Sequence, residues 1–511
     1  MSEINGFPDS WERVPIREIA KINFRDPKIR DLEDNLNVSF LPMSAVDAKD
    51  GIITDRHTRL LGKVRKGYTP FTERDVLFAK ITPCMENGKA AIATGLENGL
   101  GFGSTEFHTF HIIENVLPEW IYHYIRQQSF RVAAKANFKG TAGQLRVPKK
   151  FLEDYLLPLP PLSEQERIIK KIEELFTQLD AGLAELQEAK AQLERYRQSL
   201  LKAAVTGELT REWREAHQDE LEPAEKLLER ILAERRAKWE EKEWAKLIEK
   251  ARKKITQAER KAAGLPSKIS DLNPIDWESI DKDVYQKYLP KDEKWKEKYP
   301  SVPSPESNGN FDIPINWTVT KIENLATNIQ YGYTESASDE KIGPKFLRIT
   351  DIQEGSVDWR SVPYCEIKED DYRKYKLKRN DIVFARTGAT TGKHFLISDP
   401  HDAVFASYLI RLQLNSLVDS KYISHFFLSP YYWSQILNVR KGSAQPGVNA
   451  TLLSKLEIPL PPKEEQTRIT QIADRKLSVA DEIENEINYA IQYSERLRQS
   501  ILKQAFEGKL V

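Results

Sequence analysis

The chain has 511 residues, which exceeds one ordinary hydrophobic core and predicts about three domains. Lysine plus arginine and aspartate plus glutamate each total 77, so the formal net charge is zero. This balance excludes a uniformly basic nucleic-acid binder, although local basic faces are compatible with it. The mean hydropathy is −0.56, and no stretch approaches the ~20 apolar residues that span a membrane. Cys84 and Cys365 are isolated, so we expect a cytoplasmic protein with no membrane contact and no disulfide framework.

Residues 1–157 are expected to form a first domain. Short runs of β-forming residues, such as Val38-Ser39-Phe40-Leu41 and Val76-Leu77-Phe78, are separated by turn residues such as Lys49-Asp50-Gly51. The pattern predicts a mixed α/β (α+β) domain with a curved sheet and long loops.

Residues 158–210 carry the pattern of one long helix. After Pro160-Pro161, the spacing Ser163-x-x-Glu166 predicts a capping box at the helix start. Apolar residues then recur at steps of three and four, in a heptad seam that slips once near Gly182. The seam consists of Ile168, Ile172, Leu175, Leu179, Leu186, Ala189, Leu193, Tyr196 and Leu200.

Residues 211–312 differ from both flanking regions. Leu221 to Ala263 is predicted to be helical, with i,i+4 pairs such as Glu234–Lys238. A thin apolar stripe on this helix consists of Trp239, Trp244, Leu247 and Ile248. The rest of the segment has the composition of a flexible linker. The segment is therefore interpreted as either a solvated connector or a docking element.

Residues 313–458 are expected to form a second mixed domain. Its stretch ARTGATTGKHF, Ala385 to Phe395, has the composition of a phosphate-binding loop. A Walker loop needs four residues between its glycines and a Ser or Thr after the lysine. Here three residues separate Gly388 from Gly392, and His394 follows Lys393. The motif fails at two positions, so a nucleoside triphosphate site is not expected.

Residues 459–511 predict a second long helix. Glu464 and Glu465 lie in its first turn, where the helix dipole favours acidic side chains. Its seam, interrupted once by Lys476, consists of Ile469, Ala473, Ala480, Ile483, Ile487, Ala490, Leu497 and Ile501. A helix of about 45 residues has a length of ~68 Å.

The two halves of the chain repeat each other. LPLPPLSEQERI (157–168) recurs as IPLPPKEEQTRI (458–469), a shift of 458 − 157 = 301 residues. The same shift, without a gap, carries ERYRQSLLKAAVTGEL (194–209) onto ERLRQSILKQAFEGKL (495–510). At the start of each half, FPDSWERVPIREIA (7–20) matches IPINWTVTKIENLA (313–326). The repeat predicts two pseudo-symmetric domains separated by two long helices that form an antiparallel coiled coil.

The sequence offers no constellation for catalysis or metal binding. The eight histidines are scattered, and neither an HExxH motif nor a Cys/His cluster occurs. Acidic runs such as Glu369-Asp370-Asp371 are interpreted as solvated surface. The chain is predicted to bind rather than to catalyse, with no metal or cofactor of its own.

Two globules in tandem, each followed by PLPP…EQ.RI and a long helix ending in RQS(L/I)LK.A..G.L, resemble the specificity subunit of type I restriction–modification systems. The resemblance covers both globules and both helices, whereas residues 211–312 form an insert longer than a minimal version of the fold needs. It implies that each globule is a target-recognition domain that reads one half of a split double-stranded DNA site. It also implies that the helices act as a ruler and dock two methyltransferase subunits, which ATP-driven restriction subunits with nuclease activity then join. S-adenosylmethionine, ATP and Mg²⁺ are expected in those partner subunits.

Two pairs of loops are candidate DNA contacts, because base readout needs Arg, Lys, Asn, Gln or Thr side chains on loops. The first pair follows the matched strands DVLFAK and DIVFAR, and it offers Lys80, Thr82, Lys89, Arg386, Thr390 and Lys393. The second pair precedes the long helices, and it offers Lys139, Thr141, Gln144, Arg146, Arg440, Lys441, Ser443, Gln445 and Asn449.

Two alternative functions stay open at this point. One is the recognition arm of a fused restriction–methylation enzyme, although such a chain would carry catalytic motifs. The other is a structural scaffold whose globules bind protein partners.

Overall fold

The computed structural model describes residues 8–49, 51–141, 144–255, 257–262, 264, 286–300, 311–353, 355–387, 390–440 and 448–511. The chain divides into two compact units, residues 1–191 with 484–511 and residues 192–483. Each unit contains one globule and one part of each long helix. The two long helices are α6, Leu162–Thr206, and α16, Lys463–Phe506.

The first unit contains a globule built on a four-stranded sheet of order β2-β9-β6-β7. A second sheet has the order β4-β3-β8-β5 and includes the parallel pair β3–β8, and β1 pairs with β10. The strands of this globule are β1 Glu12–Pro15, β2 Ala20–Ile22, β3 Asn37–Leu41, β4 His57–Leu60, β5 Thr69–Thr72, β6 Val76–Ala79, β7 Ala90–Ile92, β8 Leu100–Gly103, β9 Phe107–Ile112 and β10 Leu156–Leu159. Its shorter helices are α1 Ile16–Ile19, α2 Leu61–Val64, α3 Pro118–Ile125, α4 Gln128–Ala136 and α5 Lys149–Asp154.

The second unit contains a globule built on a four-stranded sheet of order β12-β19-β16-β17, with β13 parallel to β18 and β11 paired with β20. Its strands are β11 Thr318–Lys321, β12 Ala326–Tyr331, β13 Lys345–Leu347, β14 Ile352–Gln353, β15 Ser356–Val357, β16 Ile382–Ala385, β17 His394–Leu396, β18 Ala403–Phe405, β19 Leu409–Leu414 and β20 Glu457–Leu460. Among the described residues, the helices of this unit besides α6 and α16 are α7 Arg211–Ala216, α8 Ala224–Lys254, α9 Gln257–Ala262, α11 Ile322–Leu325, α12 Glu369–Tyr375, α13 Ser420–Leu428, α14 Pro430–Arg440 and α15 Ala450–Lys455.

The two globules share one topology. Sheet β2-β9-β6-β7 corresponds strand for strand to β12-β19-β16-β17, and the pairs β1–β10 and β3–β8 correspond to β11–β20 and β13–β18. The predicted mixed domains and their pseudo-symmetry are therefore confirmed, and the repeat extends far beyond the motifs that are visible in the sequence.

The repeated PLPP…EQ motif joins each globule to the helix that follows it. Gln165 is fully buried at the start of α6, where its Oε1 accepts from the Leu117 backbone N–H at 3.0 Å and its Nε2 donates to the carbonyl oxygen of Pro160. Gln466, at the start of α16, accepts from the Asp419 N–H at 2.9 Å in the same way. A buried amide that satisfies both a donor and an acceptor of the backbone rigidly connects helix to globule.

The other repeated motif, at the end of each long helix, packs against the start of a globule. Gly508 after α16 has a φ of 67°, and a Cβ there would lie 2.5 Å from Pro8. Gly207 after α6 has a φ of 79°, and a Cβ there would lie 2.5 Å from Pro314. Both the left-handed backbone and the close approach require glycine. Each globule therefore holds the start of its own helix and the end of the other one.

The hydrophobic cores follow this arrangement. In the first unit, Trp120 and Ile168 share one core with Ile501 and Phe506 from the end of α16. In the second unit, Tyr422 and Ile469 share a core with residues from the end of α6. Neither globule has a complete core without both long helices.

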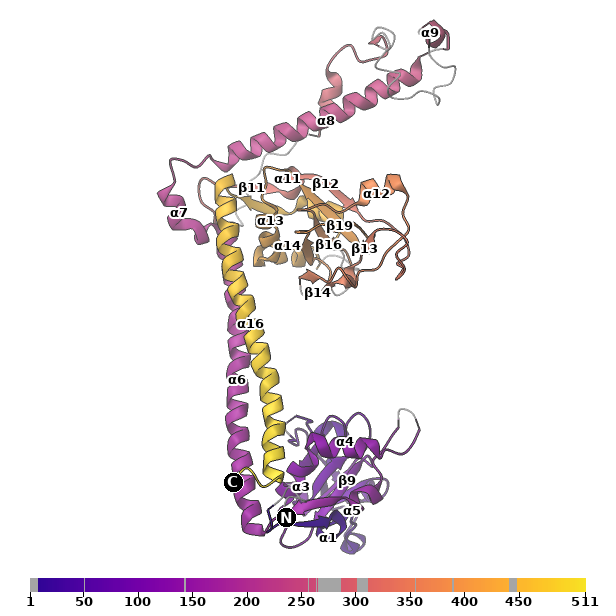
Figure 1. Cartoon of the computed structure of the whole chain (residues 1–511), viewed down its shortest axis with the longest axis vertical. Coiled ribbons are helices and arrows are strands. Elements are labelled where there is room, and N and C mark those ends of the chain that lie inside the picture. Colours follow the sequence, from indigo (N-terminus) through magenta and orange to yellow (C-terminus); the bar gives the residue numbers. More distant parts are fainter. Residues whose placement is uncertain are drawn as a thin grey trace, which may run out of the picture. The chain divides into compact units, whose positions relative to one another are not determined.

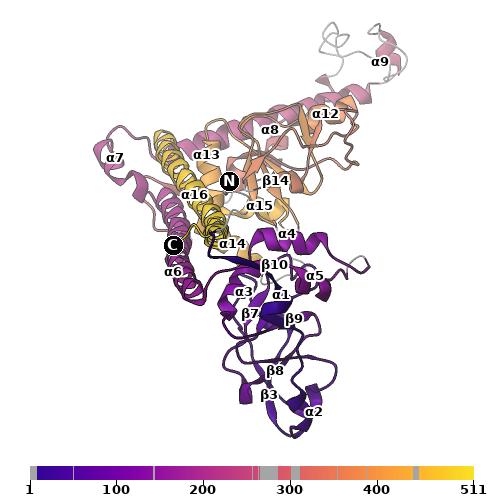
Figure 2. The same cartoon turned by 60° about the horizontal axis from the view of Figure 1, so that its bottom comes forward.

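Within each unit, α6 and α16 run antiparallel and side by side (Figures 1 and 2). Asp180 pairs with Arg498 and Lys190 bonds to Asn488 at 2.8 Å in the first unit, while Arg197 pairs with Asp481 at 2.7 Å in the second. The partner's number falls as the α6 number rises, which confirms the predicted antiparallel coiled coil.

The predicted seam is wrong at two positions. Tyr196 and Ile483 are 43% and 46% exposed, and their neighbours Arg197 and Glu484 face the opposite helix instead. Leu183, which the predicted seam omits, is buried. The middle of the helix pair is thus held partly by ion pairs, which an apolar heptad pattern does not reveal.

The predicted capping box at Ser163 is also wrong. Helix α6 begins at Leu162, and the carbonyl oxygen of Pro161 accepts from the Gln165 N–H at 3.0 Å. Ser163 therefore lies inside the first turn, because the rigid Pro160-Pro161 segment starts the helix earlier than the side-chain motif suggests.

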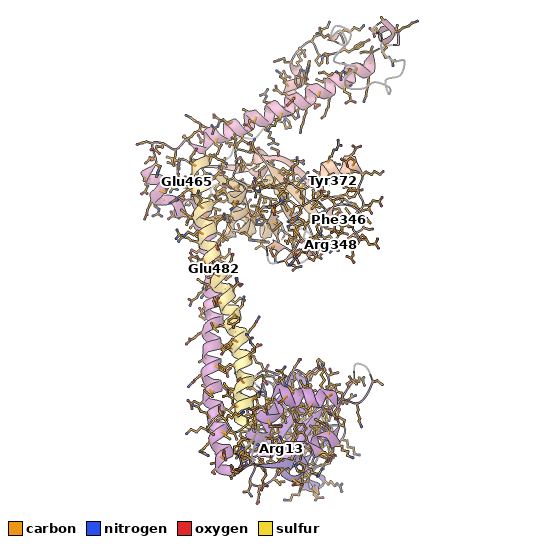
Figure 3. All side chains as sticks on the ribbon, in the orientation of Figure 1. Arg13, Phe346, Arg348, Tyr372, Glu465 and Glu482 are labelled. Atoms are coloured by element: carbon orange, nitrogen blue, oxygen red, sulfur yellow. The ribbon has the colours of Figure 1, made fainter. Side chains whose placement is uncertain are left out.

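The insert begins as a docking element. The N-terminal part of α8 buries Leu227 and Ile231 in the core of the second unit, a contact that the predicted tryptophan stripe does not include. Before it, Arg214 of α7 donates to the fully buried Glu465 at 2.7 Å, and the Trp317 Nε1 donates to the same carboxylate at 2.8 Å. Glu465 lies in the first turn of α16 (Figure 3). Much of the predicted linker lies outside the described residues. In the described parts of the chain, no helix is both long and apolar enough to cross a membrane.

Candidate nucleic-acid interface

In the first unit, the two predicted loops lie against each other. The backbone N–H of Val147 donates to the carbonyl oxygen of Lys80 at 2.9 Å, and that of Thr82 donates to the carbonyl oxygen of Leu145 at 3.2 Å. Behind this junction, His108 lies with its Nε2 2.8 Å from the Val147 carbonyl oxygen. Burial lowers the pKa of His108 to about 4, so the neutral ring donates this bond and holds the second loop in place.

The second unit repeats the junction. The Val448 N–H donates to the carbonyl oxygen of Arg386 at 3.0 Å, which is the counterpart of the bond from Val147 to Lys80. Strands β16 and β17 pair antiparallel, and the Gly392 N–H donates to the Ala385 carbonyl oxygen at 2.9 Å, so β16 is followed directly by a second strand; Gly388 and Ala389 lie outside the described residues. A phosphate-binding loop leads into a helix instead. Sequence and topology therefore agree that this stretch is not a Walker loop.

The candidate side chains of the first unit fall into two groups, those that are bonded internally or partly buried and those that are exposed. Arg146 forms two 2.8 Å bonds to Glu106, Lys89 Nζ donates to the Met43 carbonyl oxygen at 3.0 Å, and Thr82 donates to Glu86 at 2.5 Å. The hydrogen bonds from Arg146 lower the pKa of Glu106, and burial lowers the pKa of Lys80. The second group lies exposed on the second loop and consists of Lys139, Thr141 and Gln144. These three side chains are the exposed candidates of this unit and can reach a ligand directly.

In the second unit, Arg386 and Lys393 are exposed, whereas Thr390 is half-buried. Asn449 accepts from the Leu452 N–H at 2.8 Å and so caps α15. Three further candidates, Lys441, Ser443 and Gln445, lie outside the described residues, as does the side chain of Arg440.

Two aromatic residues beside Arg386 were not predicted. The Arg386 guanidinium lies 4.8 Å from the centre of the Tyr331 ring, and Tyr331 and Tyr408 are 39% and 63% exposed. A cation over an aromatic face, next to loops rich in donors, is a surface suited to nucleic acid. Both residues lie at strand ends, where the sequence pattern does not distinguish an exposed ring from a buried one.

Among the described residues, no group of three or more His, Cys, Asp or Glu side chains is arranged to hold a metal ion. The free Cys365 is buried, and burial raises the pKa of its thiol to about 11. A thiol with a raised pKa is a poor nucleophile.

Comparison with known proteins gives the family. The family model described as type I restriction modification DNA specificity domain matches residues 8–193 and 314–493. The EcoAI and EcoEI specificity subunits of type I restriction enzymes from Escherichia coli are each 28% identical to this chain. Each alignment covers 95% of this chain and 80% of the relative.

Solved structures share the fold. A chain from a structure described as showing complex assembly and conformational transition of the type I R-M system matches with a TM-score of 0.66 and 18% identity, over 98% of this chain and 99% of that one. The HsdS subunit from Thermoanaerobacter tengcongensis matches with a TM-score of 0.52 and 17% identity, over the whole of both chains. With the family model covering both globules and most of both long helices, the chain belongs to the DNA specificity subunits of type I restriction–modification systems.

Proposed function

We propose that this specificity subunit reads a split, asymmetric double-stranded DNA sequence, with one unit on each half-site. The observation that supports the proposal is the loop junction that occurs once in each unit, from Val147 to Lys80 and from Val448 to Arg386. The same scaffold carries different side chains in the two places, so two different half-sites are expected.

The proposed DNA-contacting residues are those of the two loop pairs, with the exposed ones as the first to test. Tyr331 and Tyr408 join them, because the Arg386 guanidinium lies over the Tyr331 ring and the Arg386 N–H donates to the carbonyl oxygen of the exposed Tyr408. Arg146 and Lys89 have internal partners, so they are expected to position the loops or to bind DNA only after exchanging those partners.

The partners of the proposed complex are two methyltransferase subunits, docked on the long helices, and restriction subunits. S-adenosylmethionine, ATP and Mg²⁺ would bind in those partners, and this chain would contribute recognition without a catalytic step. A helix pair whose ends are each fastened to a globule suits a ruler between half-sites.

A domain exchange tests the proposal. Residues 326–450 are replaced by the matching region of a relative. This exchange leaves the hydrogen bond from Trp317 to Glu465 intact. The hybrid, assembled with its methyltransferase, is expected to methylate DNA with one half-site changed and the other unchanged, as read by genome-wide mapping of methylated adenines. A hybrid in which both half-sites change together contradicts the proposal.

A further inference from the structure

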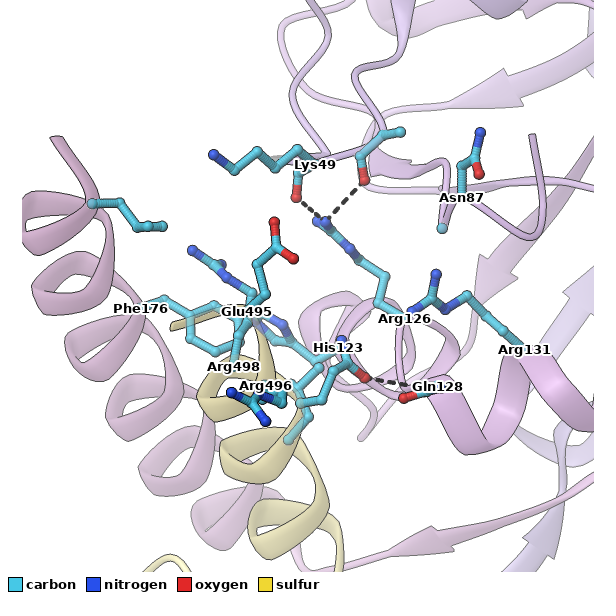
Figure 4. Close-up of a pocket in the computed structure, with 15 residues that line it drawn as sticks. Lys49, Asn87, His123, Arg126, Gln128, Arg131, Phe176, Glu495, Arg496 and Arg498 are labelled. Carbon is cyan, nitrogen blue, oxygen red and sulfur yellow. Dashed lines mark hydrogen bonds between the residues drawn. The ribbon is translucent and has the colours of Figure 1, made fainter. Parts of the chain in front are cut away.

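A cavity of about 550 Å³ lies inside the first unit, between its globule and the two long helices (Figure 4). Lys49 and Asn87 line it from loops, Arg126 and Arg131 from the end of α3 and from α4, and Phe176 from α6. Helix α16 contributes Glu495, Arg496, Arg498 and Gln499.

The lining of the cavity is strongly positive. Its cationic side chains are Lys49, Arg126, Arg131, Arg496 and Arg498, and among the described lining residues Glu495 is the one carboxylate. Burial lowers the pKa of His123, another lining residue, to about 3, so that ring is uncharged at neutral pH. Arg498 pairs with Asp180 and lies 4.2 Å from the centre of the Phe176 ring.

Two of the arginines bond to neutral oxygens. Arg126 donates to the hydroxyl of Tyr122 and to the carbonyl oxygens of Ala48 and Lys49. Arg131 donates to the carbonyl oxygen of Glu86 at 2.8 Å, and its buried Nε has no hydrogen-bond partner in the described part of the chain. Neutral partners orient a guanidinium without balancing its charge, so this cluster favours an anion.

The second unit repeats only part of the cluster. The matched bonds from Trp120 to Pro158 and from Tyr422 to Pro459 set a shift of 422 − 120 = 302 residues for this region. At that shift Arg126 corresponds to Leu428 and Arg131 to Trp433.

The shift also aligns His123 with His425, which lies 2.8 Å from the carboxylate of Asp474. The second unit thus has apolar residues in place of Arg126 and Arg131. It keeps the arginines of the helix end, since the 301-residue repeat aligns Arg496 and Arg498 with Arg195 and Arg197. The complete cationic cluster is therefore a feature of the first unit.

The cavity adjoins the candidate DNA loops. Asn87 and Gly88 belong to the loop that holds Thr82 and Lys89. In that loop, Glu86 accepts from Thr82 through its carboxylate and from Arg131 through its carbonyl oxygen.

We propose that the cationic cavity binds the DNA sugar–phosphate backbone beside the half-site read by the first unit, and that the corresponding contact is weaker at the second half-site, where Arg126 and Arg131 have no cationic counterpart. The inference rests on the proposed function. It adds a phosphate contact that has a fixed position on the DNA and does not depend on the base sequence. The first half-site should therefore contribute more than the second to the salt dependence of DNA binding.

The test uses two exposed lining residues, because Arg126 and Arg131 also hold loops in place. Lys49→Gln and Arg496→Gln each remove one positive charge, and Lys170→Gln and Arg475→Gln remove the same charge from exposed positions of the long helices outside the cavity. Each full chain is assembled with its methyltransferase, and its dissociation constant for a mapped site is measured between 50 and 200 mM salt.

Loss of one phosphate contact lowers the slope of log K against log salt by about 0.9. The ratio of the dissociation constant of each cavity variant to that of the wild type should therefore fall about 3.5-fold across this salt range. The methylated sequence should stay the same, and phosphate ethylation should interfere with wild-type binding at the first half-site more than at the second. Control variants are expected to keep the wild-type slope.

Other outcomes overturn the inference. Cavity variants with the wild-type slope would mean that no phosphate is bound there. Binding of inorganic phosphate or ATP that the variants abolish, with DNA affinity unchanged, would make this a site for a free anion. The proposed function is tested separately, by measuring the sequence preference of the wild-type complex before any variant is compared. A wild-type complex that binds all DNA sequences equally would contradict the proposed function.

Discussion

Single residues of the candidate interface differ in how freely they can reach a ligand. Arg386 stands exposed over Tyr331, whereas Arg146 is held by two bonds to Glu106. An exposed guanidinium is available for a bidentate bond to a guanine edge, which is the most common specific contact in the major groove. Arg386 is therefore the residue at which base readout is tested best.

Arg386→Ala is expected to cost ~1–3 kcal/mol in binding and to relax one position of one half-site. Competition among duplexes permuted at each position measures both effects, with Arg373→Ala on α12 as the matched control. Equal weakening on every duplex would instead identify Arg386 as a phosphate contact.

Two buried histidines, His108 and His123, and the half-buried His394 make the folded chain sensitive to acid. Burial lowers the pKa of His108 to about 4 and those of His123 and His394 to about 3, from about 6.5. Because the folded pKa values are the lower ones, the unfolded chain takes up protons first as the pH falls. The free energy of unfolding is therefore unaffected by these histidines above pH 6.5 and decreases as the pH falls from 6.5 towards the folded pKa values. Each histidine should cost about 1.4 kcal/mol per pH unit in that window.

His123→Gln should accordingly flatten the pH dependence of the unfolding free energy between pH 6.5 and 5. Urea titrations at several pH values measure it, and the slope is the readout because the substitution also changes packing. Parallel slopes for the variant and the wild type would show that His123 is not a buried neutral group.

At the scale of elements, the repeated sequence motifs are the joints between helix and globule. Gln165 and Gln466 are buried for this reason, and Gly207 and Gly508 close the opposite helix ends. Both glutamine side chains are fully buried and their bonds to the carbonyl oxygens of Pro160 and Pro461 are buried, so their loss is costly.

Gln165→Ala should destabilise the first unit by ~1–3 kcal/mol, and Gln466→Ala should do the same for the second, because each leaves a buried backbone carbonyl and a partly buried backbone N–H without their partner. Urea unfolding followed by tryptophan fluorescence measures the loss. Gln178→Ala, at an exposed position of α6, is the control and should lie within about 0.5 kcal/mol of the wild type. Equal effects at Gln165 and Gln178 would refute the assignment of the joint.

At the scale of the whole molecule, the helix pair is the continuous structural element of the chain. Leu186 is half-buried in the seam, and its counterpart by the repeat, 186 + 301 = 487, is the buried Ile487. If the pair acts as the proposed ruler, matched changes in both helices must change the gap between half-sites.

Insertion of four residues after Leu186 and after Ile487 would add ~6 Å and a rotation of ~40°. We expect the tolerated gap to lengthen by about one to two base pairs, or methyltransferase docking to be lost, with the bases read unchanged. Methylation of a library of spacer lengths measures this, and insertion into α6 alone is the control that breaks the register. An unshifted optimum at full activity would mean that the helices are a passive tether.

The repeat, the mixed domains and the antiparallel helix pair could all be predicted from the amino-acid pattern. Heptad spacing and ungapped motifs are local signals, since a helix presents every third or fourth residue to one partner. The candidate loops could be found for the same reason, as segments that follow matched strands. The predicted division into residues 1–157, 158–210, 211–312, 313–458 and 459–511 follows the same motifs and stays a prediction.

The tertiary structure decided what the loops and helices pack against. That α16 completes the first core, that Leu227 and Ile231 of α8 enter the second core, and that Arg197 replaces Tyr196 in the seam are contacts between residues far apart in the chain. The same holds for the internal partners of Lys89 and Arg146 and for the cationic cavity. Such contacts depend on which surfaces meet after the chain has folded, and local periodicity does not encode them.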